Sequence, residues 1–293
     1  MNTFNSKLAL ALGILCISIF PILVRLHLTG GLISAFYRMF IAAILLLPYV
    51  VLTKKLSIPS LKNVLLACLC GIVFASDIAI WNIAIQKSTA SQATLLANLS
   101  PLWVGVISFL FLKSKPSINF WIGTIISLFG MIILVGFQVF VELNLDLAFL
   151  LAVLAGILYS IYLLISKSVL VQTDVLSFLS IVLISSSIFL GLVCWFTDQC
   201  FTGFTPSGWF VLFIQGAICQ LVAWILISYS MKHLPTTKVS ISLLAQSVLA
   251  IFWAWLFLDE KMNLFQIIGA VFLLLGIRFT FYSKNIWSKK YKV

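Results

Sequence analysis

Charged and amide side chains inside long apolar runs are the residues of this chain most able to do chemistry. Asp77, Arg38 and Asn98 each fall in such a run, and a run of about 20 apolar residues is long enough to span a bilayer. A charge at the bilayer centre costs about 2.5–3.5 kcal/mol on insertion scales, so each charge there needs a purpose. These residues predict a binding or coupling site within a membrane.

The chemistry expected of this site follows from its side chains. A buried carboxylate at Asp77 can take up a proton or bind a substrate amine, and Arg38 can pair with it or bind a substrate carboxylate. Counted from the ends of their runs, Asp77, Arg38 and Asn98 share one depth. Two simpler alternatives stay open: a permanent Asp77–Arg38 ion pair that joins two helices, or an Arg38 side chain that reaches the outer surface without contacting Asp77.

Four further residues are candidates to line the same site. Trp81 lies one helical turn beyond Asp77 on the same face, where it would bind an organic cation or amino acid by cation–π contact or belong to the interfacial aromatic belt. Gln220 and Gln246 would bind substrate or hydrogen-bond a neighbouring helix. Tyr159 would line the cavity or pack in the core.

The elements that carry these residues are predicted to be membrane-spanning helices. Hydrophobic residues make up 63% of the chain, charged residues 9%, and the mean hydropathy is +1.21, which a soluble domain does not have. Apolar runs and breakers predict ten helices near 8–27, 32–52, 61–86, 90–112, 117–137, 146–167, 175–196, 207–231, 238–258 and 264–283. The fold class is therefore an all-α integral membrane protein.

The distribution of basic residues predicts the orientation of these helices. Most lysines fall in the loops on the side of the N-terminus and in the tail at 284–293. Positive charge collects in the cytoplasm, so both termini are expected there. The net charge of +11 thus indicates contact with anionic membrane lipid and no nucleic-acid partner.

An internal repeat divides the chain into two halves. Phe-Leu-Phe-Leu at 109–112, Lys115, Gly123 and Gly130 match Trp-Leu-Phe-Leu at 255–258, Lys261, Gly269 and Gly276, 146 residues later. Five spans per copy must reverse the orientation of the second copy, as in the inverted repeats of secondary transporters. We expect a first half at 1–142, a second at 143–283 and a basic tail at 284–293.

Glycines seven residues apart give each copy of the repeat one face without side chains. Such a face permits close helix contact. It would serve packing within the chain or dimerisation, so a monomer and a homodimer both remain open.

The chain lacks the residue patterns that common enzyme classes need for catalysis. The chain has seven acidic residues and two histidines, and it contains none of the HExxH, GxSxG or GxxxxGK[ST] patterns. Its six cysteines form no CxxC and are expected to be buried apolar residues. We predict no enzyme activity, no cofactor and no metal. A membrane scaffold or channel component is the different class that stays open.

Four local patterns resemble a known family. They are Ala-Phe-Tyr-Arg-Met-Phe-Ile-Ala-Ala at 35–43, Ser-Thr-Ala-Ser-Gln-Ala at 88–93, Asn-Leu-Ser-Pro at 98–101 and Phe-Leu-Asp-Glu-Lys at 257–261. In this order they are similar to the EamA-type members of the drug/metabolite transporter superfamily. Two positions depart from the family pattern: Ser114 stands where a glutamate is usual and Ser247 where a proline is usual, whereas Glu260 keeps the second glutamate.

The resemblance implies a permease or exporter in the inner (plasma) membrane with a small-molecule substrate, such as an amino acid or a related metabolite. Together with the repeat, it implies a secondary-active transporter that works by alternating access. Proton coupling through Asp77 and an uncoupled facilitator or exchanger are the two alternatives for its energetics.

Overall fold

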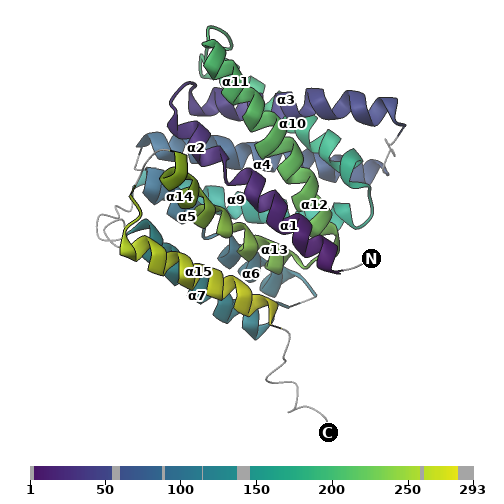
Figure 1. Cartoon of the computed structure of the whole chain (residues 1–293). Coiled ribbons are helices and arrows are strands. Elements are labelled where there is room, and N and C mark those ends of the chain that lie inside the picture. Colours follow the sequence, from purple (N-terminus) through teal and green to yellow (C-terminus); the bar gives the residue numbers. More distant parts are fainter. Residues whose placement is uncertain are drawn as a thin grey trace.

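A computed structural model describes residues 3–54, 60–87, 90–113, 115–136, 146–257 and 261–282. All regular elements in these ranges are helices, and most run roughly parallel or antiparallel to one another (Figure 1). The predicted boundary between halves at 142 and 143, Glu260 and the basic tail at 284–293 lie outside the described residues.

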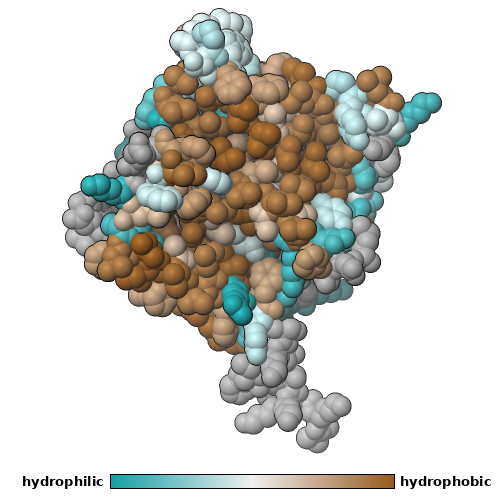
Figure 2. All heavy atoms as spheres, in the orientation of Figure 1, coloured by the Kyte–Doolittle hydropathy of each residue, from teal (hydrophilic) through white to brown (hydrophobic). Residues whose placement is uncertain are grey.

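The helices form ten candidate membrane spans, which confirms the predicted number and class. The spans are Phe4–Arg25, Gly31–Leu52, Leu61–Ile85, Ala93–Phe111, Ile118–Val135, Leu147–Leu170, Val175–Phe196, Pro206–His233, Thr236–Phe257 and Leu264–Phe281. Their bounds follow the predicted runs within a few residues. A broad apolar surface covers the face seen in Figure 2, as lipid contact requires.

Six spans are single helices and four are composite. The single helices are α3 (Gly31–Leu52), α4 (Leu61–Lys87), α7 (Ile118–Val135), α9 (Leu147–Leu170), α10 (Val175–Phe196) and α15 (Leu264–Phe281). Span one divides into α1 (Thr3–Ile17) and α2 (Phe20–Arg25), and span four into α5 (Ala90–Ala97) and α6 (Ser100–Phe111). Span eight consists of α11 (Pro206–Ile214), the π-helix η1 (Gln215–Val222) and α12 (Ala223–His233), and span nine of α13 (Thr236–Leu243) and α14 (Ala245–Phe257).

Prolines account for two of the interruptions. Pro21 and Pro101 have no backbone N–H to continue the helical ladder. Pro101 thereby leaves the carbonyl of Ala97 without its helical donor, and α5 ends at that residue. A free carbonyl at membrane depth is stable only where it faces protein or a wet cavity.

Span nine is interrupted without a proline. Its break falls at Leu244, between α13 and α14, and Leu244 lies 146 residues after Asn98, at the break in span four. Both copies of the repeat are therefore broken at the same position. Ser247 stands where the family usually has a proline, so the break in span nine is maintained by packing rather than by residue type.

Glycine contacts join the last spans of the two halves. A Cβ added to Gly123 would overlap the backbone of Gly276, and a Cβ added to Gly130 would overlap that of Gly269. The two helices, α7 and α15, therefore cross antiparallel at very short distance. The glycine faces serve packing within one chain, which decides between the two roles left open for them.

The remaining spans exchange partners between the halves. Helix α4 packs against α9 and α10, and the equivalent span, composed of η1 and α12, packs against α1 and α3. The equivalent helices α3 and α10 pack against each other. This exchange is the pattern expected of two halves related by a two-fold axis.

The start of the first span and the end of the last span lie on the same side of the molecule. The ammonium of Lys7 on α1 lies 5.5 Å from the ring centre of Phe281 at the end of α15, and Figure 1 shows both described ends on one side. We call this side the terminal face.

Candidate functional site

Arg38 and Asp77 meet inside the helix bundle. Arg38 on α3 is 6% exposed and Asp77 on α4 is 9% exposed, and the two groups interact electrostatically. The half-buried Tyr159 on α9 interacts with both. Three helices, two from the first half and one from the second, thus position these groups together.

The two charges do not form an ion pair. In the part of the chain that the structure describes, no ion pair or hydrogen bond joins Asp77 to Arg38, and the buried Nε of Arg38 has no hydrogen-bond partner. A buried charge without full pairing is costly, so this arrangement is unusual for a purely structural contact.

Neither simpler alternative for these residues fits. A locked Asp77–Arg38 ion pair is absent from the described residues, where no ion pair or hydrogen bond joins the two side chains. A side chain of Arg38 that reaches the outer surface is also wrong, because the residue is buried.

The guanidinium of Arg38 rests on an aromatic ring. Its Cζ atom lies 4.4 Å from the ring centre of Phe20, the first residue of α2. Phe20 follows the interruption between α1 and α2, so the broken span one supplies the ring beside Arg38. A desolvated cation–π contact stabilises the charge by about 2 kcal/mol or more.

A π-helix forms another wall of this site. Helix η1 packs against α3, where a Cβ added to Gly216 would lie 3.4 Å from the carbonyl oxygen of Arg38, and Gln215 accepts a hydrogen bond of 2.5 Å from the hydroxyl of Ser34 on α3. The Oε1 atom of Gln220 is buried without a partner. Stretches of π-helix are frequent at functional sites, and this one presents an amide with unused hydrogen-bonding capacity.

Aromatic side chains fill the bundle between this site and the terminal face. The ring of Phe74 lies 4.5 Å from Tyr162 and 4.9 Å from Trp224, between ring centres. Tyr162 and Trp224 are 5.4 Å apart, and Tyr159 stacks on Tyr162 at 6.2 Å. We call Phe74, Tyr162 and Trp224 the aromatic layer, and all three are buried.

The other predicted site residues lie around this group. Asn98 at the break in span four and Gln246 just after the break in span nine are half-buried, and neither side chain makes a hydrogen bond within the described ranges. Trp81 packs in a separate apolar cluster with Ala84 and Leu96. No hydrogen bond or electrostatic interaction within those ranges joins these three residues to Arg38 or Asp77.

Sequence reasoning missed two contributors to the site. Phe20 directly precedes Pro21, and a proline that can interrupt a helix is the signal that could have drawn attention to it. The π-helix has no comparable signal, because its residues are ordinary for a transmembrane helix.

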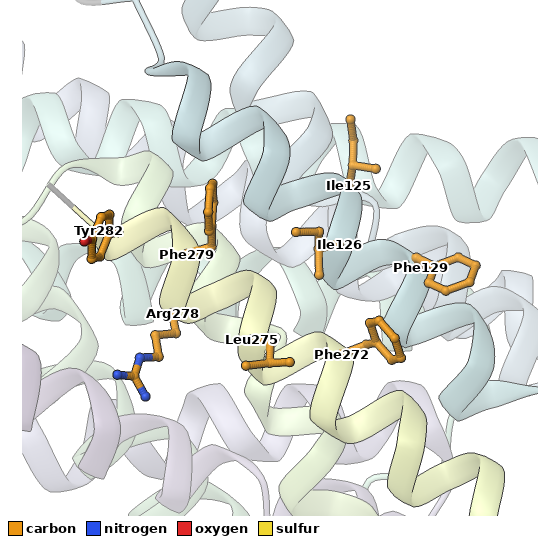
Figure 3. A pocket seen from close by; sticks show the side chains of 8 residues that line it. All are labelled: Ile125, Ile126, Phe129, Phe272, Leu275, Arg278, Phe279 and Tyr282. Atoms are coloured by element: carbon orange, nitrogen blue, oxygen red, sulfur yellow. The ribbon is translucent and has the colours of Figure 1, made fainter. Parts of the chain in front are cut away.

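Two apolar grooves lie on the outside of the bundle. One of 610 Å³ runs between α7 and α15 and is lined by apolar residues such as Phe129 and Phe272 (Figure 3). The other, of 440 Å³, lies between α3 and α10. Both are apolar crevices on surfaces that would face lipid. Arg278 borders the first and points away from α7 in Figure 3.

Comparisons with known proteins agree with this architecture. The model of the EamA-like transporter family matches residues 6–136 and 146–282. The uncharacterized transporter YdfC of Bacillus subtilis is 23% identical over 256 residues, which cover 87% of this chain and 83% of YdfC. The uncharacterized transporter YoaV of the same organism is 26% identical over 281 residues, 90% of this chain and 92% of YoaV.

A solved crystal structure has the same fold. It superposes with a TM-score of 0.79 over 94% of this chain and 97% of its own, at 15% sequence identity. That likeness concerns the fold alone.

Proposed function

Since the chain belongs to the EamA-like transporter family and is a multi-pass membrane transporter, we propose that it is a secondary-active carrier of small organic solutes. Arg38 and Asp77 bind the solute or the coupling ion, and two inverted halves alternate access to them. The observation that carries the proposal is a buried acid and a buried base that interact without pairing.

The substrate class follows from the two opposite charges. A solute with an amine and a carboxylate, such as an amino acid, would satisfy Asp77 and Arg38 at once and replace the water lost on binding. Gln220 adds an unused amide oxygen, and Tyr159 an aromatic wall with a hydroxyl. Trp81, Asn98 and Gln246 would contact the more distant parts of the solute.

Energy coupling is assigned to Asp77. A carboxylate that exchanges between a proton and a substrate amine couples the two fluxes, and export from the cytoplasm across the inner (plasma) membrane is the direction we propose. An uncoupled facilitator or exchanger is the second candidate. It is favoured by the neighbouring Arg38, whose positive charge would help to keep Asp77 ionised.

The first test is a thermal-stability screen of the purified protein in detergent against amino acids, nucleosides, polyamines and organic cations. Wild type, Asp77→Asn and the control Asp146→Asn are compared. Asp146 is exposed and caps α9, and asparagine caps helices as well as aspartate does. We expect a ligand that raises the melting temperature of wild type and Asp146→Asn but not of Asp77→Asn. Equal stabilisation of all three would remove Asp77 from substrate binding.

The second test measures transport of that ligand in proteoliposomes. Saturable counterflow is expected of a carrier, and its rate should depend on pH in wild type but not in Asp77→Asn if protons are coupled. Counterflow that is independent of pH in both proteins would favour the facilitator. Flux that rises linearly with concentration would indicate a channel component and contradict the proposal.

A further inference from the structure

The two halves differ in several packing relationships, and one of them closes an end of the bundle. Helices α9 and α12, which belong to spans six and eight, pack against each other. The equivalent of α9 in the first half is span one, which α1 and α2 form. The equivalent of α12 is α4. In the described ranges these form no packed helix pair. Most other helix pairs obey the exchange between halves, so the α9–α12 contact marks an end of the bundle that is closed.

Two lysines hold this closed end. The ammonium of Lys167 on α9 donates to the carbonyls of Met231, Lys232 and Leu234 at 2.7, 3.0 and 3.0 Å. The ammonium of Lys232 donates to the carbonyl of Thr173, beyond the end of α9, at 2.7 Å. The last carbonyls of a helix lack partners and carry the negative end of its dipole. Each lysine therefore caps the other helix.

This closed end lies at the terminal face. Ser230, on the last turn of α12, donates to the carbonyl of Ser6 at the start of α1, at 2.8 Å. Asn63, near the start of α4, donates to Gln172, just after α9, at 3.2 Å. The ends of four helices are thus joined around the two lysines.

The lysines and the aromatic layer lie in series. Along α9 the order is Tyr159, Tyr162 and Lys167, and along span eight Gln220 and Trp224 precede Met231. A solute that leaves the Arg38–Asp77 site toward the terminal face must pass first the aromatic layer and then the crossed lysines.

We infer that Lys167 and Lys232 form a latch that keeps the pathway closed at the terminal face, and that its release opens the site to that side. The inference rests on the proposed transport function. Among the described residues both lysines bond only to backbone carbonyls, so release requires no second side chain to lose its partner. The two lysines are half-buried, and their ammonium groups can turn to water or lipid phosphate when the helices part.

A native cysteine can report the opening. Cys70 on α4 is fully buried, and its thiol contacts the hydroxyl of Ser166, the neighbour of Lys167, at 3.6 Å. It lies one turn from Phe74, on the terminal side of the aromatic layer. A chain that keeps Cys70 and has the other five cysteines replaced by alanine would react with a water-soluble maleimide only while this end is open.

The experiment compares the labelling rate of Cys70 in four such chains without substrate: unmodified, Lys167→Met, Lys232→Met and Lys62→Met. Lys62 is an exposed lysine at the start of α4, so its replacement removes the same charge without touching the latch. We expect a several-fold faster reaction in Lys167→Met, a smaller increase in Lys232→Met and no change in Lys62→Met. Lys167→Arg, which keeps donors, should react more slowly than Lys167→Met.

A second reporter separates opening from unfolding. Cys194 on α10 is buried near the opposite end of the bundle, and a chain that keeps only this cysteine should stay unreactive in every variant. An unchanged Cys70 rate in both latch variants would overturn the inference. An equal rise in the labelling rate of Cys194 in both latch variants would also overturn it, because the lysines would then support the fold as a whole.

Failure of the latch and failure of the proposed function give different results. Labelling needs no solute, whereas counterflow does. Unchanged labelling with saturable counterflow overturns the latch and leaves the carrier. Faster labelling in a protein without counterflow for any solute class keeps the latch and overturns the proposed transport.

Discussion

Ser127 on α7 donates a hydrogen bond of 3.1 Å to the carbonyl of Leu273 on α15. Leu273 lies 146 residues later, so it is the counterpart of Ser127 in the repeat. A residue that contacts its own counterpart lies on or near the two-fold axis that relates the copies. This contact therefore places the axis between α7 and α15, at the centre of their glycine crossing.

The crossing predicts that a single methyl group is destabilising. A Cβ in Gly130→Ala would overlap the backbone of Leu273, which cannot move without separating the halves. Overpacking of this kind costs about 1–3 kcal/mol. We expect a lower melting temperature in detergent than for the wild type. Gly30→Ala is the control, because its Cβ would meet neighbours only at 3.6 Å; equal effects of the two would contradict the close crossing.

The break in span four predicts that one substitution can lower transport without lowering stability. Pro101→Ala restores the backbone donor for Ala97, so α5 and α6 can join into one helix. We expect counterflow to fall while the melting temperature is kept or raised. Pro48→Ala is the matched control, since Pro48 lies exposed within the unbroken α3. Full transport activity in Pro101→Ala would show that the break has no role in the transport cycle.

The contact between Arg38 and Phe20 predicts a measurable coupling. Stability of the wild type, Arg38→Met, Phe20→Leu and the double variant gives a double-mutant cycle. We expect a coupling free energy of about 0.5–2 kcal/mol, because the ring lies 4.4 Å from the guanidinium in a desolvated place. Additive effects would mean that Phe20 only fills space beside Arg38.

The orientation in the membrane is tested by Cys200, which is exposed between α10 and α11. The start of α10 follows Thr173 at the terminal face, so Cys200 lies on the other side. With both termini cytoplasmic, an impermeant maleimide should label Cys200 in intact cells. The chain that keeps only the buried Cys70 provides the unlabelled control. Labelling of Cys200 only after permeabilisation would reverse the orientation.

Most of the helical architecture was predictable because lipid imposes simple rules. Length and hydropathy decide where spans such as α3 and α10 begin and end, since every backbone group in a bilayer must be paired within its own helix. Pro21 and Pro101 also indicate where spans one and four are interrupted. The break at Leu244 and the π-helix at Gln215–Val222 were not predictable, because packing between spans rather than residue type maintains them.

The site was predictable in part. The cost of burying a charge identified Asp77 and Arg38 without any structure. The position of Asp77 relative to Arg38 depends on how α3 and α4 pack, and the aromatic ring beside Arg38 depends on where α2 lies. The role of Lys167 was not predictable, because nothing in the sequence tells which carbonyls an ammonium at a helix end will reach.

The repeat is symmetric in its scaffold but not in its polar residues. The positions 146 residues after Asp77 and Arg38 are Ala223 and Ile184. Two identical half-length subunits around the same axis would carry two acids and two bases, and a zwitterion could then bind in two reversed poses of equal energy. Fusion into one chain removes that degeneracy. A bound zwitterion would have a single head-to-tail polarity, set by the two charged side chains of the first half.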